Sequence, residues 1–125
     1  MALNHAGPGT LIDARPLGER LLDTPTHALL KTTSIELMRV VLAAGRSLPP
    51  HSVPGEITVQ CIEGRVRQRA GSGDHSMRAG DLVLLPGGDR HSVEAVEDSS
   101  LLVTVALAQA GAVSGRGSSG GTAAR

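Results

Sequence analysis

The 125-residue sequence contains no phenylalanine, tryptophan or tyrosine. A hydrophobic core must therefore consist of aliphatic side chains and methionine, and the aromatic surface on which nucleic-acid bases usually stack is excluded. The same absence removes ring packing as a way to hold a sugar or a flat ligand. The 12 basic and 12 acidic side chains balance, so no charge excess points to nucleic acid or to an anionic membrane.

Cysteine and long apolar runs are also scarce. Cys61 is the single cysteine, which excludes a disulfide within the chain. No run of about 18 apolar residues is present, so a membrane-spanning helix is not expected. The N-terminus lacks the basic region and the apolar stretch of a signal peptide. These absences predict a cytoplasmic protein of one domain with no membrane or nucleic-acid partner.

Most of the chain consists of short segments with β-branched residues or period-two alternation, separated by glycine and proline. These segments predict strands over residues 26–31, 34–44, 56–62, 65–70, 76–78, 82–85, 91–96 and 101–107. A short strand is also expected at residues 10–14 and a helical turn at 15–23. Three prolines and a glycine predict an extended loop at 48–55. Many short strands joined by turns indicate an antiparallel all-β barrel or sandwich.

The stretch from Gly80 to His91 combines an apolar strand with a tight turn. The continuous apolar run Leu82–Leu85 predicts a buried core strand. The proline that follows has no backbone N–H and ends the strand, and the two glycines after it let the chain reverse. Asp89 and Arg90 are expected to pair and shape this turn. His91 is then the first residue of the next expected strand, at one end of the sheet.

This segment resembles the second conserved motif of the cupin family, G-x5-P-x-G-x2-H. Gly80, Pro86, Gly88 and His91 occupy its fixed positions, and Ala95 stands where an asparagine often follows. The resemblance covers residues 34–107. It implies an all-β, cupin-type double-stranded β-helix, which is a jelly-roll barrel, and it implies a homodimer.

The first cupin motif, G-x5-H-x-H-x3-E-x6-G, is present in part. Gly45, His51 and Gly64 fit its frame. Two positions that carry metal ligands in the family hold aliphatic residues, because Val53 replaces the second histidine and Ile57 replaces the glutamate. The frame therefore retains one of its three ligand-type residues.

The resemblance and the composition divide the chain into three parts. Residues 1–30 are expected to form a leader with short strands, and residues 31–108 the cupin barrel. Residues 109–125 are rich in glycine, serine and alanine and have no apolar period. They are expected to form a disordered tail, because so little apolar surface cannot offset the entropy lost on ordering.

His51 and His91 are the candidate site residues. The cupin resemblance implies that they stand on adjacent strands and face each other across the barrel interior. Imidazole nitrogens that converge in this way suit a divalent transition metal, although cupins with metal chemistry generally supply four ligands. The alternative is that both histidines line a small pocket and bond to the backbone or to water.

The register of residues 56–61 decides what lies beside the histidines. In the family frame Ile57 and Val59 face inward with Leu84. A one-residue slip at a bulge would turn Glu56 and Gln60 inward instead, where either side chain offers a third metal ligand. The apolar face is favoured, because burying the two polar side chains unpaired costs free energy.

Two main functions follow, and a structural subunit with a vestigial pocket is a third. One is a non-enzymatic or sensory barrel that binds a small, largely apolar molecule with one polar group. The alternative is a metal-dependent enzyme of the oxygenase or isomerase type, with His51 and His91 as metal ligands. The two missing ligand positions favour the first function, and the sequence names neither the ligand, the metal nor a reaction. The predicted pocket residues are His51, Ile57, Val59, Gln60, Leu84 and His91.

Overall fold

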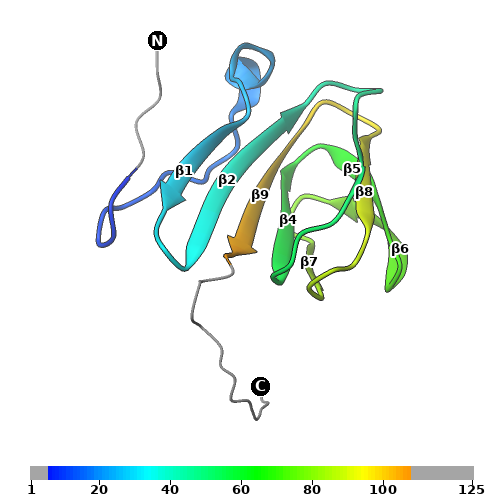
Figure 1. Cartoon of the computed structure of the whole chain (residues 1–125). Coiled ribbons are helices and arrows are strands. Elements are labelled where there is room, and N and C mark those ends of the chain that lie inside the picture. The colour runs from blue at the N-terminus through cyan, green and yellow to red at the C-terminus, as the bar shows by residue number, and fades with distance from the viewer. Residues whose placement is uncertain (1–5, 108–125) are drawn as a thin grey trace.

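A computed structural model of the protein describes residues 6–107, and this part of the chain forms two antiparallel sheets that face each other (Figure 1). The elements are a 3₁₀ helix η1 (Gly18–Asp23) and the strands β1 (His27–Lys31), β2 (Ile35–Leu42), β3 (Ser47–His51), β4 (Ile57–Glu63), β5 (Arg65–Ala70), β6 (Gly73–Arg78), β7 (Leu82–Leu85), β8 (His91–Ala95) and β9 (Ser99–Ala106). One sheet has the order β1-β2-β9-β4-β7 and the other the order β3-β8-β5-β6. The predicted all-β class is confirmed.

Strand β4 has one apolar face, and that face points between the sheets. Ile57, Val59 and Cys61 are buried, whereas the side chains that alternate with them are partly exposed. β4 pairs in regular register with β7 and, over most of its length, with β9. The family-frame register is confirmed. The slipped register, with Glu56 and Gln60 inward, is wrong, because it would replace three core side chains by polar ones.

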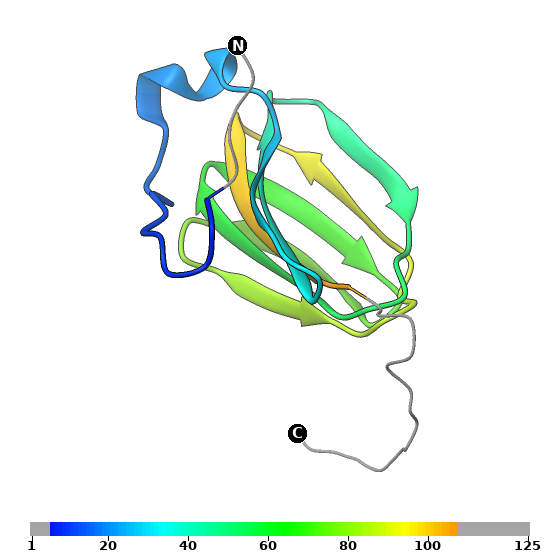
Figure 2. The same ribbon diagram turned by 60° about the vertical axis from the view of Figure 1, so that its left-hand side comes forward.

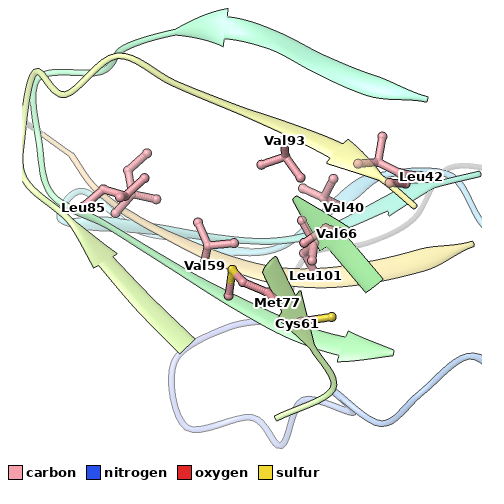
Figure 3. Close-up of a cluster of buried hydrophobic side chains, with 11 residues drawn as sticks. Val40, Leu42, Val59, Cys61, Val66, Met77, Leu85, Val93 and Leu101 are labelled. Carbon is pink, nitrogen blue, oxygen red and sulfur yellow. The ribbon is translucent and has the colours of Figure 1, made fainter. Parts of the chain in front are cut away.

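The core lies between the sheets and consists of aliphatic side chains, one methionine and one cysteine (Figure 3). Both sheets contribute to it, as expected for a sandwich or barrel whose strands alternate inward and outward. Its buried members are Val40, Leu42, Ile57, Val59, Cys61, Val66, Met77, Leu85, Val93, Ala95 and Leu101.

Strand β7 is an edge strand, and Leu85 is the one buried residue among its four. Leu85 is 1% exposed, whereas Leu82 and Leu84 are 63% and 57% exposed. The prediction of a buried core strand is therefore wrong for Leu82 and Leu84 and holds for Leu85. A continuous apolar run contains no period, and one face of this strand lies on the outer side of its sheet.

The homodimer implied by the resemblance stays a prediction.

The N-terminal segment covers part of the outer side of the five-stranded sheet (Figure 2). Glu63 holds it there, because its carboxylate accepts hydrogen bonds from the backbone N–H groups of Leu17 and Gly18 at 2.8 and 3.1 Å. The Ser100 hydroxyl donates a third, short hydrogen bond. Burial alone would raise the pKa of Glu63, but these hydrogen bonds outweigh it and lower the pKa. The anchor is thus an ionised carboxylate.

A second anchor explains why residues 10–14 do not form the predicted strand. Arg39 is 2% exposed, and its guanidinium donates to the backbone carbonyl of Asp13 at 3.1 Å. This segment is fixed by side chains of the sheet below it and makes no ladder of its own. The helical turn expected at 15–23 is present as η1.

Two boundaries also differ from the expectation. β3 overlaps the predicted loop 48–55. Pro49 and Pro50 are tolerated there because the strand is at a sheet edge and its register shifts between Leu48 and His51. β1 crosses the expected start of the barrel at residue 31, because it pairs with β2. The predicted tail at 109–125 lies outside the described residues. Within residues 6–107, no helix has the length and apolar character needed to cross a membrane.

Candidate functional site

A cavity of about 450 Å³ lies between the sheets, at the end where β2, β4 and β8 begin and β9 ends. Most of its wall is aliphatic, from both sheets and from the loop between β3 and β4. The polar residues of the lining are Thr26, Glu36, His51, His91 and Ser92. The aliphatic ones include Met38, Val40, Leu48, Val53, Ile57, Val59, Val93, Leu101, Val103 and Val105.

The two predicted site histidines lie side by side in this wall. His51 and His91 are cross-strand partners of β3 and β8. Their ring centroids are 4.4 Å apart and the rings are tilted by 58°. His91 is 5% exposed and His51 is exposed. The predicted juxtaposition on adjacent strands is confirmed, and the pair occupies the edge of the cavity.

Backbone carbonyls define which ring nitrogen carries the proton. Nδ1 of His91 lies 2.9 Å from the Asp89 carbonyl oxygen, and Nδ1 of His51 lies 3.3 Å from that of Pro49. A carbonyl oxygen only accepts hydrogen bonds, so Nδ1 is the donor in each neutral ring. Nε2 of both rings is therefore left with a free lone pair that accepts a hydrogen bond.

The loop before His91 is held by Asp89. Its carboxylate accepts hydrogen bonds from the Ser72 hydroxyl at 2.6 Å and from the N–H groups of Gly71 and Ser72. The Ser72 hydroxyl is the main cause of the lowered pKa of Asp89. The predicted pairing of Asp89 with Arg90 is wrong: within residues 6–107 Arg90 has no ion pair, and Asp89 instead ties this loop to the β5–β6 turn.

The predicted pocket residues separate into two groups. Ile57 and Val59 line the cavity with the histidines. Gln60 and Leu84 do not, and both predictions are wrong. The cross-strand partner of Leu84 is Thr58, and both Thr58 and Gln60 alternate with the buried residues of β4. Gln60 and Leu84 therefore lie on the outer face of the five-stranded sheet.

The donor set does not fit a metal centre. The family positions of two further ligands hold Val53 and Ile57, and both aliphatic side chains line the cavity. Residues 6–107 contain no group of three or more His, Cys, Asp or Glu side chains arranged to hold a metal ion. The two Nε2 atoms of His51 and His91 fall short of the three protein ligands usual in catalytic zinc sites.

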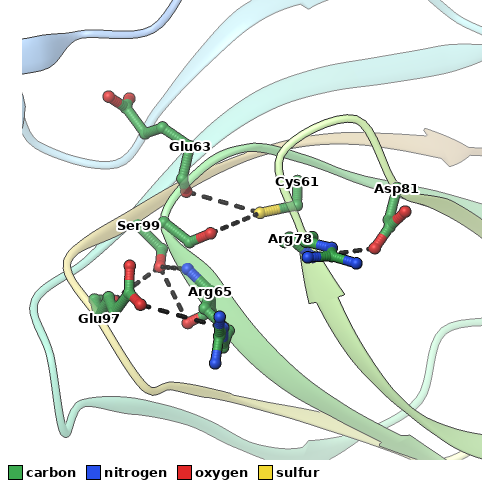
Figure 4. Close-up of polar contacts among 8 residues, drawn as sticks. Cys61, Glu63, Arg65, Arg78, Asp81, Glu97 and Ser99 are labelled. Carbon is green, nitrogen blue, oxygen red and sulfur yellow. Dashed lines mark hydrogen bonds and ion pairs between the residues drawn. The ribbon is translucent and has the colours of Figure 1, made fainter.

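Cys61 is a buried apolar residue and takes no part in the cavity lining. Burial raises the pKa of its thiol, so the thiolate needed for a nucleophile is disfavoured. Its sulfur lies 3.5 and 3.8 Å from the backbone carbonyl oxygens of Glu63 and Gly64, and the contact with Glu63 is visible in Figure 4. This is the environment of an unreactive core cysteine.

Sequence reasoning missed Glu36 as a lining residue, together with Met38 on the same strand. β2 is apolar on both faces, so its alternation gave no sign of which face points inward. Pairing with β9 settles it, because Glu36 is the partner of Val105, whose side chain lines the same cavity. The motif frame begins nine residues later, at Gly45, and offers no signal for this strand.

Comparison with known proteins gives one family and a common fold. The family described as "Cupin domain" matches residues 38–107. A conserved protein of unknown function from Streptococcus pyogenes is 20% identical, with a TM-score of 0.67 over 88% of this chain and 100% of that one. No curated protein matches the chain.

Two further solved structures are similar to this chain. An RmlC-like cupin protein from Desulfovibrio desulfuricans is 25% identical, with a TM-score of 0.62 over 77% of this chain and 97% of that one. An RmlC-like cupin family protein with a double-stranded β-helix fold from Methanocaldococcus jannaschii is 16% identical, with a TM-score of 0.64 over 79% and 94%. The predicted double-stranded β-helix is therefore confirmed.

Proposed function

The chain belongs to the cupin domain family over residues 38–107, and we propose that its barrel binds a small, largely aliphatic molecule that carries one polar group. The observation that carries this proposal is the cavity of about 450 Å³ with a mostly aliphatic wall. Its size falls in the range of known ligand pockets, which are lined mainly by apolar side chains with a few polar groups that orient the ligand.

The wall matches such a ligand in two ways. Burial of each methylene group against side chains such as Val103 and Val105 contributes about 0.8 kcal/mol. The Nε2 atoms of His51 and His91 supply hydrogen-bond acceptors at the edge, because their Nδ1 atoms are already bonded to carbonyls. A molecule with an alkyl body and a hydrogen-bond donor satisfies both parts of the wall.

Calorimetric titration with hexan-1-ol tests this function. We expect saturable binding of one molecule per chain with a negative heat-capacity change, because apolar surface is removed from water. An alcohol has the required donor and the required alkyl body and carries no charge. Absence of saturable binding up to the solubility limit of the alcohol would contradict the proposal.

A metal-dependent enzyme is the alternative function, and the feature that supports it is the pair of free Nε2 lone pairs on rings 4.4 Å apart. We expect untagged protein to contain far less than one transition metal ion per chain, because two imidazoles are a weak ligand set. We also expect no rise in melting temperature on addition of zinc, manganese, nickel or iron(II) salts.

Elemental analysis and melts followed by circular dichroism measure both quantities, since the chain has no tryptophan or tyrosine to report unfolding. Close to one metal ion per chain, lost in both His51→Ala and His91→Ala, would establish the metal site and overturn this expectation. Thr58→Ala, on the outer face of β4, is the control that should leave the metal content unchanged.

A further inference from the structure

The part of the cavity wall formed by residues 6–107 contains one acidic side chain and no basic one. Glu36, on β2, lines the cavity and is half-buried. Within residues 6–107 its carboxylate has no hydrogen-bond or ion-pair partner. Among the residues that the structure describes, no lysine or arginine belongs to the lining. The carboxylate of Glu36 therefore faces the cavity without a cationic partner among the described residues of the wall.

The other polar groups of the wall also influence which ligands the cavity accepts. Nε2 of both His51 and His91 is an acceptor in the neutral ring. The Thr26 hydroxyl already accepts from the N–H of Val41 at 2.9 Å, so it is engaged with the backbone. Glu36 and the two imidazoles thus offer hydrogen-bond acceptors, and the other polar lining residues, Thr26 and Ser92, carry neutral hydroxyls. A carboxylate ligand would bring a second negative charge into this apolar space without a partner, which is unfavourable.

We propose that the cavity selects aliphatic amines in their ammonium form over aliphatic carboxylates. This selectivity rests on the proposed binding function. An ammonium group has three N–H donors and a positive charge, which the Glu36 carboxylate satisfies. Val105 and Ile57 follow Glu36 in one cross-strand row on the inner face of the sheet. The alkyl chain of the ligand packs along this row while its charged end stays at Glu36.

Lys31 is the basic residue closest to Glu36 by strand register. The two residues are cross-strand partners of β1 and β2, but Lys31 is exposed and does not form an ion pair with the carboxylate. Directly opposed side chains of an antiparallel pair lie on the same face. The lysine therefore competes with a bound ammonium group, and removing its charge should strengthen amine binding.

Calorimetric titrations of the full chain at about pH 8 with hexylamine, hexan-1-ol and hexanoate test the selectivity. We expect hexylammonium to bind about tenfold more tightly than hexanoate. Glu36→Gln, which keeps the side-chain shape, should weaken hexylammonium binding about five- to tenfold, and this loss should exceed any change in hexan-1-ol binding. Lys31→Gln should strengthen hexylammonium binding by up to about threefold. Circular dichroism melts confirm that both variants fold.

The outcomes separate this inference from the function on which it rests. Saturable binding of hexan-1-ol with hexanoate as tight as hexylammonium would overturn the selectivity and leave the binding function in place. Unchanged hexylammonium affinity in Glu36→Gln would also overturn it. Failure of all three six-carbon probes to bind would overturn both.

Discussion

Leu85→Ala is expected to lower the free energy of unfolding by about 2–5 kcal/mol, the usual loss for a buried leucine. Leu85 is 1% exposed and packs in the core between the sheets. Leu84→Ala, one position earlier, is the matched control. Leu84 is 57% exposed on the outer face, so its truncation should change the free energy by no more than about 0.5 kcal/mol.

Urea unfolding followed by far-ultraviolet circular dichroism measures the loss in the free energy of unfolding for each variant relative to the wild type. The two variants remove the same atoms from neighbouring residues of β7, so their difference reports which face of the strand points inward. Equal losses, or a larger loss for Leu84→Ala, would show that the register of β7 is wrong and would return Leu84 to the pocket.

Val103→Phe is expected to weaken hexan-1-ol binding at least about tenfold, because the ring occupies space that the ligand would take. Val103 lines the cavity from β9. Thr104→Phe adds a ring to the next residue, which pairs with Thr58 and Leu37 on the outer face. We expect this control to bind hexan-1-ol within about twofold of the wild type, since its side chain points away from the cavity.

Titration calorimetry of the three proteins under one condition measures the effect, and thermal melts check that each variant is folded. Insertion of extra atoms into a tightly packed core costs about 1–3 kcal/mol, but a cavity of about 450 Å³ accepts a phenyl ring with less strain. Equal affinity of Val103→Phe and the wild type would place the alcohol outside the barrel.

The sequence carried enough information to predict the position of the two histidines. The turn after β7 combines a proline, which ends the strand, with Gly88, which has a φ of 79° that favours glycine. Together with the spacing of the family motifs, this turn predicted that His51 and His91 lie on adjacent strands. The period-two pattern of residues 56–62 likewise predicted which face of β4 is buried.

The errors share one physical cause, which is that strand pairing is set by residues far apart in the chain. An all-apolar run such as Leu82–Leu85 has no period from which its inner face can be read. The same is true of β2, so Glu36 was not found. The irregular course of residues 10–14 depends on hydrogen bonds to Arg39 and on the covered side of a distant sheet, and no local pattern reports it.

The central claim is that a small aliphatic ligand lies between the two sheets, and methyl NMR during a hexan-1-ol titration tests it most directly. With leucine and valine methyl groups labelled, we expect saturating shifts for Val59, Val103 and Val105, which line the cavity. Methyl groups of Leu82 and Leu84, which are exposed on the outer face, should not shift. Shifts confined to those two leucines, or no saturating shift at all, would contradict the account.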